Sequence, residues 1–500
     1  MQIGSISAGF SVLGQAALDA KNKILDLQTQ IATGKKSTTY SGMGLGEGFA
    51  VAARSQIGNI GAFADTITNV NTSINVANTA LQSLSNGLRT VQSAITTAPR
   101  DIASTGQTTA QQIAQAQLSS MLGVLNTQAG DRYVFSGAAT DTASVASFDD
   151  ILNGNGALAG VSQMITERTQ ADLGAGGMGR ITVSAPGAGI TLTSLTEDGS
   201  VFGLKLNSIT STLTGATVVQ PGGGPPPTAS VDLGPTNPND GDKVTFKFNL
   251  PDGTTEDITL TATTTNPPPA GSFLIDTTSD LTATNLNAAL NTAITTLANT
   301  SLTAASAVTA TNSFFSGAPQ RVNGPPATAM TLVAATPADT VTWYTGDAGG
   351  GPARATAIAR VDTSVTVQYG VRANEQAIRT QLQGAAVLAA FHTIAGGANS
   401  SAQITALFNR VQQQLTVQPG QQTVDNIQSE LANAQTVMKD ASSRQTQAKA
   451  TLQSLTDNVE NITSEEVISQ ILALQTSVQA SYQSASILSQ LSLVKFLPIG

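Results

Sequence analysis

Apolar residues recur at every third or fourth position from almost the first residue of the chain. The steps alternate between 3 and 4 through Ile3, Ile6, Phe10, Leu13, Ala17, Ala20, Ile24, Leu27 and Ile31. This heptad spacing predicts a helix with one apolar stripe. Because an isolated helix of this kind is marginal in water, the stripe requires a partner.

More helices follow in the N-terminal part. A heptad series over residues 57–95 predicts a long helix that Pro99 ends, and a helical pattern over about 108–128 stops at Gly130. The glycine-rich residues 41–48 lack the Lys-Ser/Thr of a phosphate loop and follow a helix rather than a strand. We interpret them as a break between two helices.

The C-terminal part repeats the pattern of the N-terminal part. Steps of 3 and 4 alternate over residues 424–462, and shorter helices are expected at about 374–395 and 402–416. A last series contains Val467, Ile471, Leu474, Val478, Tyr482, Ala485, Leu488 and Leu491. We expect the first stripe to pack against this last one. The alternative is that each stripe packs only within its own local hairpin.

The pattern changes to period 2 in the middle of the chain. Runs of this kind occupy 181–184, 190–193, 244–250, 258–263 and 365–369. Residues Pro251, Asp252 and Gly253 form a turn signal that predicts a β-hairpin. Leu286, Leu290, Ile294 and Leu297 indicate one helix in this region. The stretches PGGGPPP (221–227) and Pro267–Pro269 are typical of linkers or loops.

These patterns predict a mainly α protein with an inserted α+β region. Long N- and C-terminal helices pair as a coiled-coil-like bundle, and one or two β-rich outer domains lie between them. The expected parts are 1–40 (axial core), 41–138 (bundle), 139–365 (insertion, with a possible division near 221–240), 366–462 (bundle) and 463–500 (axial core).

Composition narrows the possible partners. Charged residues make up 11% and aromatic residues 4%, so the surface is largely neutral and polar. Such a surface suits dense self-association, although a secreted protein with a neutral surface would have the same composition. The net charge is −9, and we find no basic cluster, so nucleic acid and anionic membrane surfaces are not expected as partners.

The chain has no cysteine, which excludes disulfides, Cys-zinc sites and a thiol nucleophile. It has no apolar run long enough to span a membrane, and its N-terminus lacks the features of a cleavable signal peptide. We therefore expect no transmembrane segment, and, if the protein is exported, a route other than a conventional signal.

Candidate catalytic residues are few. The only histidine, His392, falls in an expected helix without a nucleophile elbow nearby, so we interpret it as an ordinary helix residue. Glu465 and Glu466, together with Asp457 and Glu460, are either paired carboxylates or a solvated helix start capped by Thr463 or Ser464. We favour the helix start.

Two further stretches have a possible binding role. NPNDGD (237–242) offers oxygen ligands for Ca²⁺ but lacks the spacing of a calcium loop, so we interpret it as a turn. Trp343 and Tyr344 either contact a carbohydrate or, in an alternating strand over 341–345, place one ring in a small core. We expect no catalytic, cofactor-binding or metal-binding residue, and no enzyme activity.

Four segments resemble the flagellin superfamily. LQTQIATGKKST (27–38) is similar to the segment that closes the family's first helix. DRYVFSG (131–137) and YGVRANEQAIR (369–379) resemble the hook-associated proteins of the hook–filament junction. The ending LSLVKFL (491–497) is similar to that group and to filament flagellins alike. The resemblance covers about residues 1–137 and 365–500.

Two features depart from the family pattern. Common filament flagellins carry an Asp-Asp-Ala-Ala-Gly run after the first helix, where this chain has residues 41–47 without paired aspartates. The insertion is also larger than is typical of junction proteins. The resemblance therefore favours a junction protein and leaves a filament-forming flagellin as the alternative. A secreted carbohydrate-binding adhesin that uses the central insertion is the alternative from another class.

The resemblance implies a structural subunit of the flagellar axial assembly, outside the cell, exported through the flagellum without a cleavable signal peptide. Its implied partners are copies of itself, a hook-side adaptor, filament flagellin and an export chaperone. The expected assembly stripe comprises Ile3, Ile6, Phe10, Leu13, Ile24, Leu27, Ile31, Val467, Ile471, Leu474, Val478, Leu488, Leu491, Val494, Phe496 and Leu497.

Overall fold

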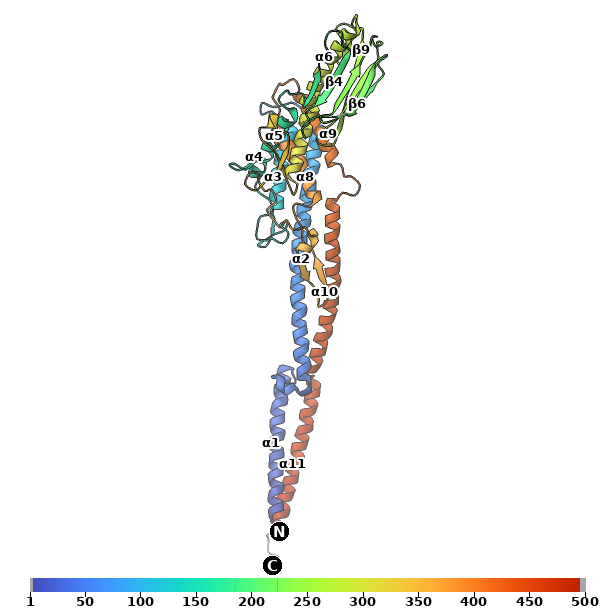
Figure 1. The fold of residues 1–500 in the computed structure, drawn as a ribbon. Coiled ribbons are helices and arrows are strands. Elements are labelled where there is room, and N and C mark those ends of the chain that lie inside the picture. Colours follow the sequence, from blue (N-terminus) through green and yellow to red (C-terminus); the bar gives the residue numbers. More distant parts are fainter. Residues whose placement is uncertain (1–2, 185, 223, 495–500) are drawn as a thin grey trace, which may run out of the picture. The chain divides into compact units, whose positions relative to one another are not determined.

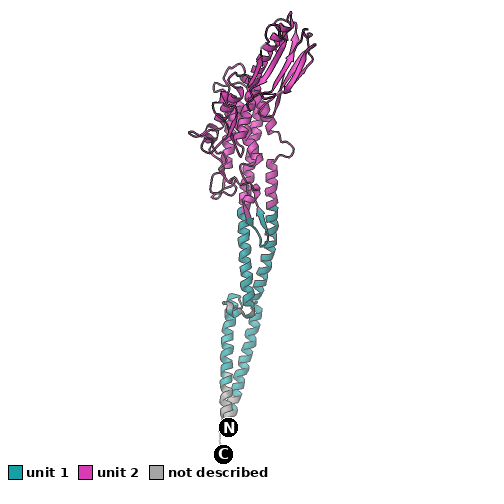
Figure 2. Ribbon diagram, in the orientation of Figure 1, with its two compact units in different colours: residues 1–69, 359–367, 435–500 teal, residues 70–358, 368–434 magenta. Residues whose placement is uncertain are grey.

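The computed structural model describes residues 3–184, 186–222 and 224–494 (Figure 1). Helices take up about 53% of the residues and strands 16%, so the fold is mainly α with a β-containing region. The chain divides into two compact units (Figure 2). Unit 1 comprises residues 1–69, 359–367 and 435–500, and unit 2 comprises 70–358 and 368–434.

The secondary structure alternates long helices with a block of strands. The α-helices are α1 (Ile3–Thr33), α2 (Glu47–Thr97), α3 (Thr109–Leu125), α4 (Phe148–Asn153), α5 (Val161–Leu173), α6 (Ser279–Leu297), α7 (Thr303–Phe314), α8 (Gln376–Ala390), α9 (Ser400–Leu415), α10 (Val424–Glu460) and α11 (Ser464–Val494). The short helical turns are η1 (Tyr40–Gly46), η2 (Ala298–Leu302), η3 (Pro326–Thr328) and η4 (Ala353–Thr356).

The strands form two larger sheets and three small pairs. They are β1 (Gln128–Ala129), β2 (Arg132–Tyr133), β3 (Ile181–Ser184), β4 (Leu192–Glu197), β5 (Lys205–Ser211), β6 (Thr217–Gly222), β7 (Thr228–Asp232), β8 (Lys243–Asn249), β9 (Thr255–Thr263), β10 (Ser272–Leu274), β11 (Gln320–Val322), β12 (Leu332–Ala334), β13 (Ile358–Arg360) and β14 (Thr366–Gln368). The pairs are β1–β2, β11–β12 and β13–β14.

In unit 1, the first and last helices of the chain lie against each other, as α1 and α11 show in Figure 1. The turns that follow α1 and α10 are joined by backbone hydrogen bonds. The N–H of Lys36 donates to the carbonyl oxygen of Glu460 at 2.7 Å, and the N–H of Ile462 donates to that of Gly34 at 3.1 Å. Gly34 has a φ of 67°, a conformation that glycine adopts without strain. The two chain ends are thereby held in one unit.

The heptad stripe predicted for residues 57–95 lies on α2, which at 51 residues is longer than the prediction, and most of it is buried from Ile67 onward, whereas Ile57 and Ile60 are only half-buried. Its buried members include Ile67, Val70, Ile74, Ala77, Leu81, Leu84, Val91 and Ile95. On α10 the predicted stripe is buried as far as Gln445, but Leu455 is 42% exposed and Thr456 is buried instead. An α-helix has 3.6 residues per turn, so a stripe with a period of 3.5 drifts around it.

Helices form one part of unit 2. Helix α8 contacts α3, α7 and α9, and α7 contacts α5 and α9. The side chains of Gln107 and Gln111, next to the start of α3, donate to the carbonyl oxygens of Ala389 (2.8 Å) and Phe391 (2.6 Å). These carbonyls lie at the end of α8 and have no partner within the helix. The helix expected over 374–395 therefore ends at Ala390, where Phe391 turns extended.

Two four-stranded sheets form the other part of unit 2, in the orders β3-β4-β7-β6 and β10-β9-β8-β5. Within the described residues of these two sheets, only β10 pairs in parallel, with β9. The two sheets meet through a side chain, because the amide of Gln220 in β6 accepts from the N–H of Ile209 (3.0 Å) and donates to its carbonyl oxygen (2.6 Å). Gln220 thus continues the hydrogen bonding from β6 to β5.

A single hydrophobic core joins both sheets and helix α6. It includes Leu195 and Val231 from one sheet, Phe246 and Phe248 from the other, and Leu290 from α6. Residues before and after 221–240 share this core, so this stretch does not separate two cores. The predicted linker 221–227 connects β6 to β7, and its first residues belong to β6.

Several predictions for the middle region can be compared directly with the structure. The hairpin over Pro251–Gly253 is confirmed as the antiparallel pair β8–β9, in which Phe246 faces Ile258 across the strands. The predicted helix is confirmed as α6, but the expectation of one helix in this region is wrong, because α4, α5 and α7 also lie within it. The strand expected at 190–193 is shifted to β4. The strand expected at 341–345 is wrong, because only one isolated bridge, between Val145 and Tyr344, is present there.

Candidate functional site

The N-terminal part of the predicted assembly stripe lies on α1. Leu27 is buried, Ile24 is half-buried and Ile31 is 39% exposed. The side chains of Ile3, Ile6, Phe10 and Leu13 lie outside the described residues. The contact of α1 with α11 therefore buries the described part of this stripe only near its C-terminal end.

The C-terminal part lies on α11. Val467 is fully buried, and Ile471, Leu474 and Val478 are half-buried. The next half-buried residue on this face is Ser481 and not Tyr482, which is 64% exposed. The side chains of Leu488, Leu491 and Val494, and all of Phe496 and Leu497, lie outside the described residues.

Both helices also carry apolar residues that face away from their contact. We call them the outer apolar residues: Val12, Leu18, Leu25, Ile468, Leu472, Tyr482 and Ile487, which are between 49% and 69% exposed. Leu18 and Leu25 are one heptad apart and share a helix face. Apolar residues grouped in this way often mark an interaction surface. Of this second set, only Tyr482 was expected from the sequence, and it was assigned to the stripe between the two helices, although the heptad spacing of Leu18 and Leu25 was visible.

A salt bridge joins α2 to the end of α10 inside unit 1. An Nη2 atom of Arg54 lies 2.5 Å from Oε2 of Glu460. The Glu460 side chain is 5% exposed, whereas that of Arg54 is 47% exposed. The sequence analysis placed Glu460 in a solvated acidic cluster, and this is wrong: the carboxylate is buried because the turns after α1 and α10 close over it.

The remaining acidic residues of that cluster agree with the helix-start interpretation. The N–H of Glu466 donates to Oγ1 of Thr463 at 3.3 Å, so Thr463 caps α11. Glu465 and Glu466 occupy the first turn of α11, where the helix dipole favours negative charge.

The two segments that resemble junction proteins contact each other in unit 2. The N–H of Ala373 donates to the carbonyl oxygen of Phe135 at 2.9 Å, and the N–H of Gly137 donates to that of Val371 at 3.1 Å. The ring of Phe135 is completely buried. Segments that lie more than two hundred residues apart in the sequence thus form one short backbone ladder.

Charged side chains surround this ladder. Arg372 donates to Asp347 (2.8 Å) and to the carbonyl oxygen of Gly349 (2.6 Å). Arg354 donates to both carboxylate oxygens of Glu375, at 2.5 and 2.6 Å. The N–H of Gly349 and the Arg372 guanidinium both hydrogen-bond Asp347, and they hold the pKa of its carboxyl below 3.8. Arg372 and Glu375 of the segment YGVRANEQ therefore hold loops in place.

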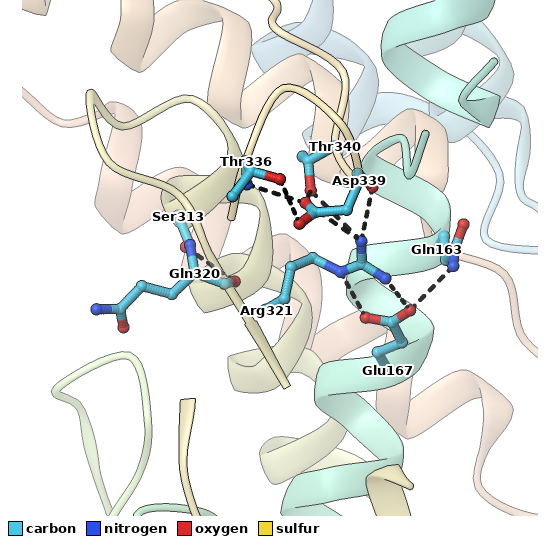
Figure 3. A network of polar contacts seen from close by, with 8 residues as sticks. All are labelled: Gln163, Glu167, Ser313, Gln320, Arg321, Thr336, Asp339 and Thr340. Carbon is cyan, nitrogen blue, oxygen red and sulfur yellow. Dashed lines mark hydrogen bonds and ion pairs between the residues drawn. The ribbon is translucent and has the colours of Figure 1, made fainter. Parts of the chain in front are cut away.

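A second charged network ties β11 to α5 (Figure 3). Arg321 binds Glu167 through Nε at 2.8 Å and Nη2 at 2.5 Å, and it donates to the carbonyl oxygen of Asp339 at 2.8 Å. The hydrogen bond with Glu167 raises the pKa of the Arg321 guanidinium. The carboxylate of Asp339 accepts from Thr336 and Thr340 at 2.7 Å each. The described donors and acceptors of this network are engaged with one another.

The side chains of the other candidate residues, His392 and Asp242, lie within hydrogen-bond distance of nearby backbone groups. His392 follows α8 instead of lying within it, and its Nδ1 is 2.9 Å from the carbonyl oxygen of Ala390. In the stretch 237–242, Asp242 accepts from the N–H groups of Thr214 and Asn239 at 2.9 Å each. The N–H of Thr214 is the main cause of a lowered pKa at Asp242. These bonds fit the turn that the sequence predicted.

No model of a known protein family matches the chain, and the comparison with curated proteins finds no relative. Within the described residues, no helix is both long and apolar enough to cross a membrane. The same part of the chain contains no group of three or more His, Asp or Glu side chains placed to hold a metal ion.

Proposed function

We propose that this protein is a structural subunit of the bacterial flagellar axial assembly and not an enzyme. The observation that carries the proposal is the set of outer apolar residues on α1 and α11. These two helices already contact each other, so a further partner is needed to cover the remaining apolar side chains. Burying one exposed leucine or isoleucine contributes about 1.5–3 kcal/mol. Neighbouring copies of the chain in a tube would supply that cover.

We propose further that α1 and α11 pair as a coiled coil through the predicted assembly stripe. The heptad spacing of Ile24, Leu27 and Ile31 and of Val467, Ile471 and Leu474 supports this pairing. In this arrangement the stripe holds the two termini of one subunit together, and the outer apolar residues face other subunits. The two surfaces then have separate roles.

Within the axial assembly, we assign the protein to the hook–filament junction. The segments DRYVFSG and YGVRANEQAIR support this position, as does the absence of paired aspartates in residues 41–47. The partners are then the hook-side adaptor, filament flagellin, copies of the chain and an export chaperone. The alternative within the same class is a filament-forming flagellin.

Labelling of the protein along isolated flagella tests both parts of the proposal. Label confined to the end of the hook supports the junction position, label along the whole filament supports the filament alternative, and label absent from flagella contradicts both. A deletion strain provides a second test. For a junction protein, we expect complete hooks and filament protein shed into the medium.

A further inference from the structure

Unit 2 contains a cavity of about 410 Å³ between the end of α7 and the start of α8. Its walls include Phe314 and Phe315 from α7, Trp343 and Tyr344 from the loop after β12, and Arg379 from α8. This volume lies within the range of small-molecule sites, which are mainly apolar and carry a few polar groups.

The aromatic rings form a continuous chain along the cavity. The ring centroids are 5.1 Å apart for Phe314 and Phe315, 5.1 Å for Phe315 and Trp343, and 5.8 Å for Trp343 and Tyr344. All four residues are at least nine-tenths buried. Trp343 is the only tryptophan of a chain in which aromatic residues make up 4%. Aromatic side chains are thus concentrated in the wall of this cavity.

Two polar side chains in the cavity wall, those of Arg379 and Asn374, have no binding partner among the described residues. Among the described residues, the guanidinium of Arg379 and the amide of Asn374 have no hydrogen bond or ion pair. The nearby Arg372, Arg354 and Arg321 each bind a carboxylate. Arg379 also lies near the start of α8, where the positive end of the helix dipole disfavours a cation. Its half-buried positive charge therefore lacks a negative partner.

Most of the other polar side chains of the wall already bind a group of the protein. Thr336 and Thr340 line the cavity, but both donate to Asp339 in the network of Figure 3. Tyr344 donates to the carbonyl oxygen of Asp347 at 3.0 Å. Among the described residues of the wall, Arg379 and Asn374 are consequently half-buried groups available to a ligand, one as a charged donor and one as a neutral amide, together with the exposed hydroxyl of Thr342.

We propose that this cavity binds a small organic anion that joins a carboxylate to a ring with an apolar face. The fork of donors on an arginine matches a carboxylate in two parallel hydrogen bonds. The aromatic walls match an apolar ring face, either of an aromatic acid or of a sugar acid. The inference does not depend on the flagellar proposal, because it concerns the purified chain alone.

Fluorescence of Trp343 reports on this site without a label, since the chain has no other tryptophan. The full-length protein is titrated with glucuronate, benzoate and glucose, and calorimetry provides a second readout. We expect glucuronate or benzoate to change the emission saturably, with a Kd of about 1 mM or tighter. Tighter binding of benzoate identifies the ligand as an aromatic acid, and tighter binding of glucuronate identifies it as a sugar acid. Glucose, which lacks the carboxylate, should bind at least tenfold more weakly.

Substitutions at two arginines make the test specific. Arg379→Gln removes the charge and should weaken binding at least tenfold without lowering the melting temperature, because the guanidinium holds nothing in the fold. Arg89→Gln is the matched control, since Arg89 is exposed on α2 and contacts only Asn86 at 3.4 Å among the contacts described. No binding of either anion, equal binding of glucose, or unchanged binding by Arg379→Gln overturns the proposal. Equal loss in Arg89→Gln also overturns it.

Discussion

The N–H of Ala373 donates to the carbonyl oxygen of Phe135 at 2.9 Å, and the Phe135 ring is fully buried. This bond joins the segment after α3 to the segment before α8. The two segments belong to opposite halves of the chain, so the fold of unit 2 depends on their meeting.

Replacement of this ring should destabilise unit 2. We expect Phe135→Ala to lower the free energy of unfolding by about 3–5 kcal/mol, because a buried aromatic ring leaves a cavity. Chemical denaturation measures the loss. Ile394→Ala is the control, since Ile394 is 79% exposed and its loss should cost little. A similar effect of both substitutions would contradict the role of Phe135.

Gly106 marks a close approach between the start of α3 and the segment after α8. A Cβ at Gly106 would lie 2.1 Å from the carbonyl oxygen of Thr393, and the φ of Gly106 is 77°. We expect Gly106→Ala to cost about 2 kcal/mol or more, by strain and by the clash. Gly123→Ala on α3 has open space around it and should stabilise the helix by about 0.5–1 kcal/mol. Thermal unfolding should show a lower melting temperature for Gly106→Ala and a higher one for Gly123→Ala.

The salt bridge of unit 1 should respond unequally to the loss of its two partners. Arg54→Met leaves the buried carboxylate of Glu460 without its arginine, and we expect a loss of about 2–4 kcal/mol. Glu460→Gln leaves a half-exposed guanidinium that water can solvate, so its cost should be about 1 kcal/mol. Hydrogen exchange at Lys36 and Ile462, whose N–H groups bond across the two turns, measures the local effect. Equal costs would contradict the burial of Glu460.

The carboxyl of Asp347 should make unit 2 sensitive to acid. Its pKa is held below 3.8 in the fold, chiefly by the N–H of Gly349 and then by Arg372. The stability it contributes is therefore complete above pH 3.8 and is lost as the pH falls through the lower pKa of the folded state. We expect Asp347→Asn to be less stable at neutral pH and to lose less stability below pH 3.8. Asp141→Asn, at an exposed position, should follow the wild type.

The outer apolar residues should matter for assembly and not for the monomer. We expect the double variant Leu18→Ser, Leu25→Ser to keep the melting temperature of the monomer, because both leucines are exposed there. The variant should enter flagella at least about tenfold less, because it removes apolar surface that neighbouring subunits would bury. Val417→Ser is the control, since Val417 is 64% exposed and lies in unit 2. Normal incorporation of the double variant would argue against assembly through this face.

Local signals in the sequence predicted many elements correctly. The helix over 57–95 and the hairpin at Pro251–Gly253 follow from periodicity and turn chemistry, which act between neighbouring residues. The end of α8 was missed because it is set by Gln107 and Gln111, whose amides bind carbonyls almost three hundred residues further along the chain. The strand expected at 341–345 is absent because the alternation of apolar residues there reflects burial against other segments.

The sequence by itself determined the helices outside residues 139–365, helix α6, where the pattern changes to strands, and which apolar stripes need a partner, since these depend on spacing along the chain. Helices α4, α5 and α7 were not predicted. Only the tertiary structure decided what covers each stripe. It buried Glu460 beside Arg54, left Leu18 and Leu25 exposed, and brought Phe135 to Ala373. It also enclosed Trp343 and Arg379 around one cavity. Burial and pairing between distant segments are properties of the packed chain, and no local pattern encodes them.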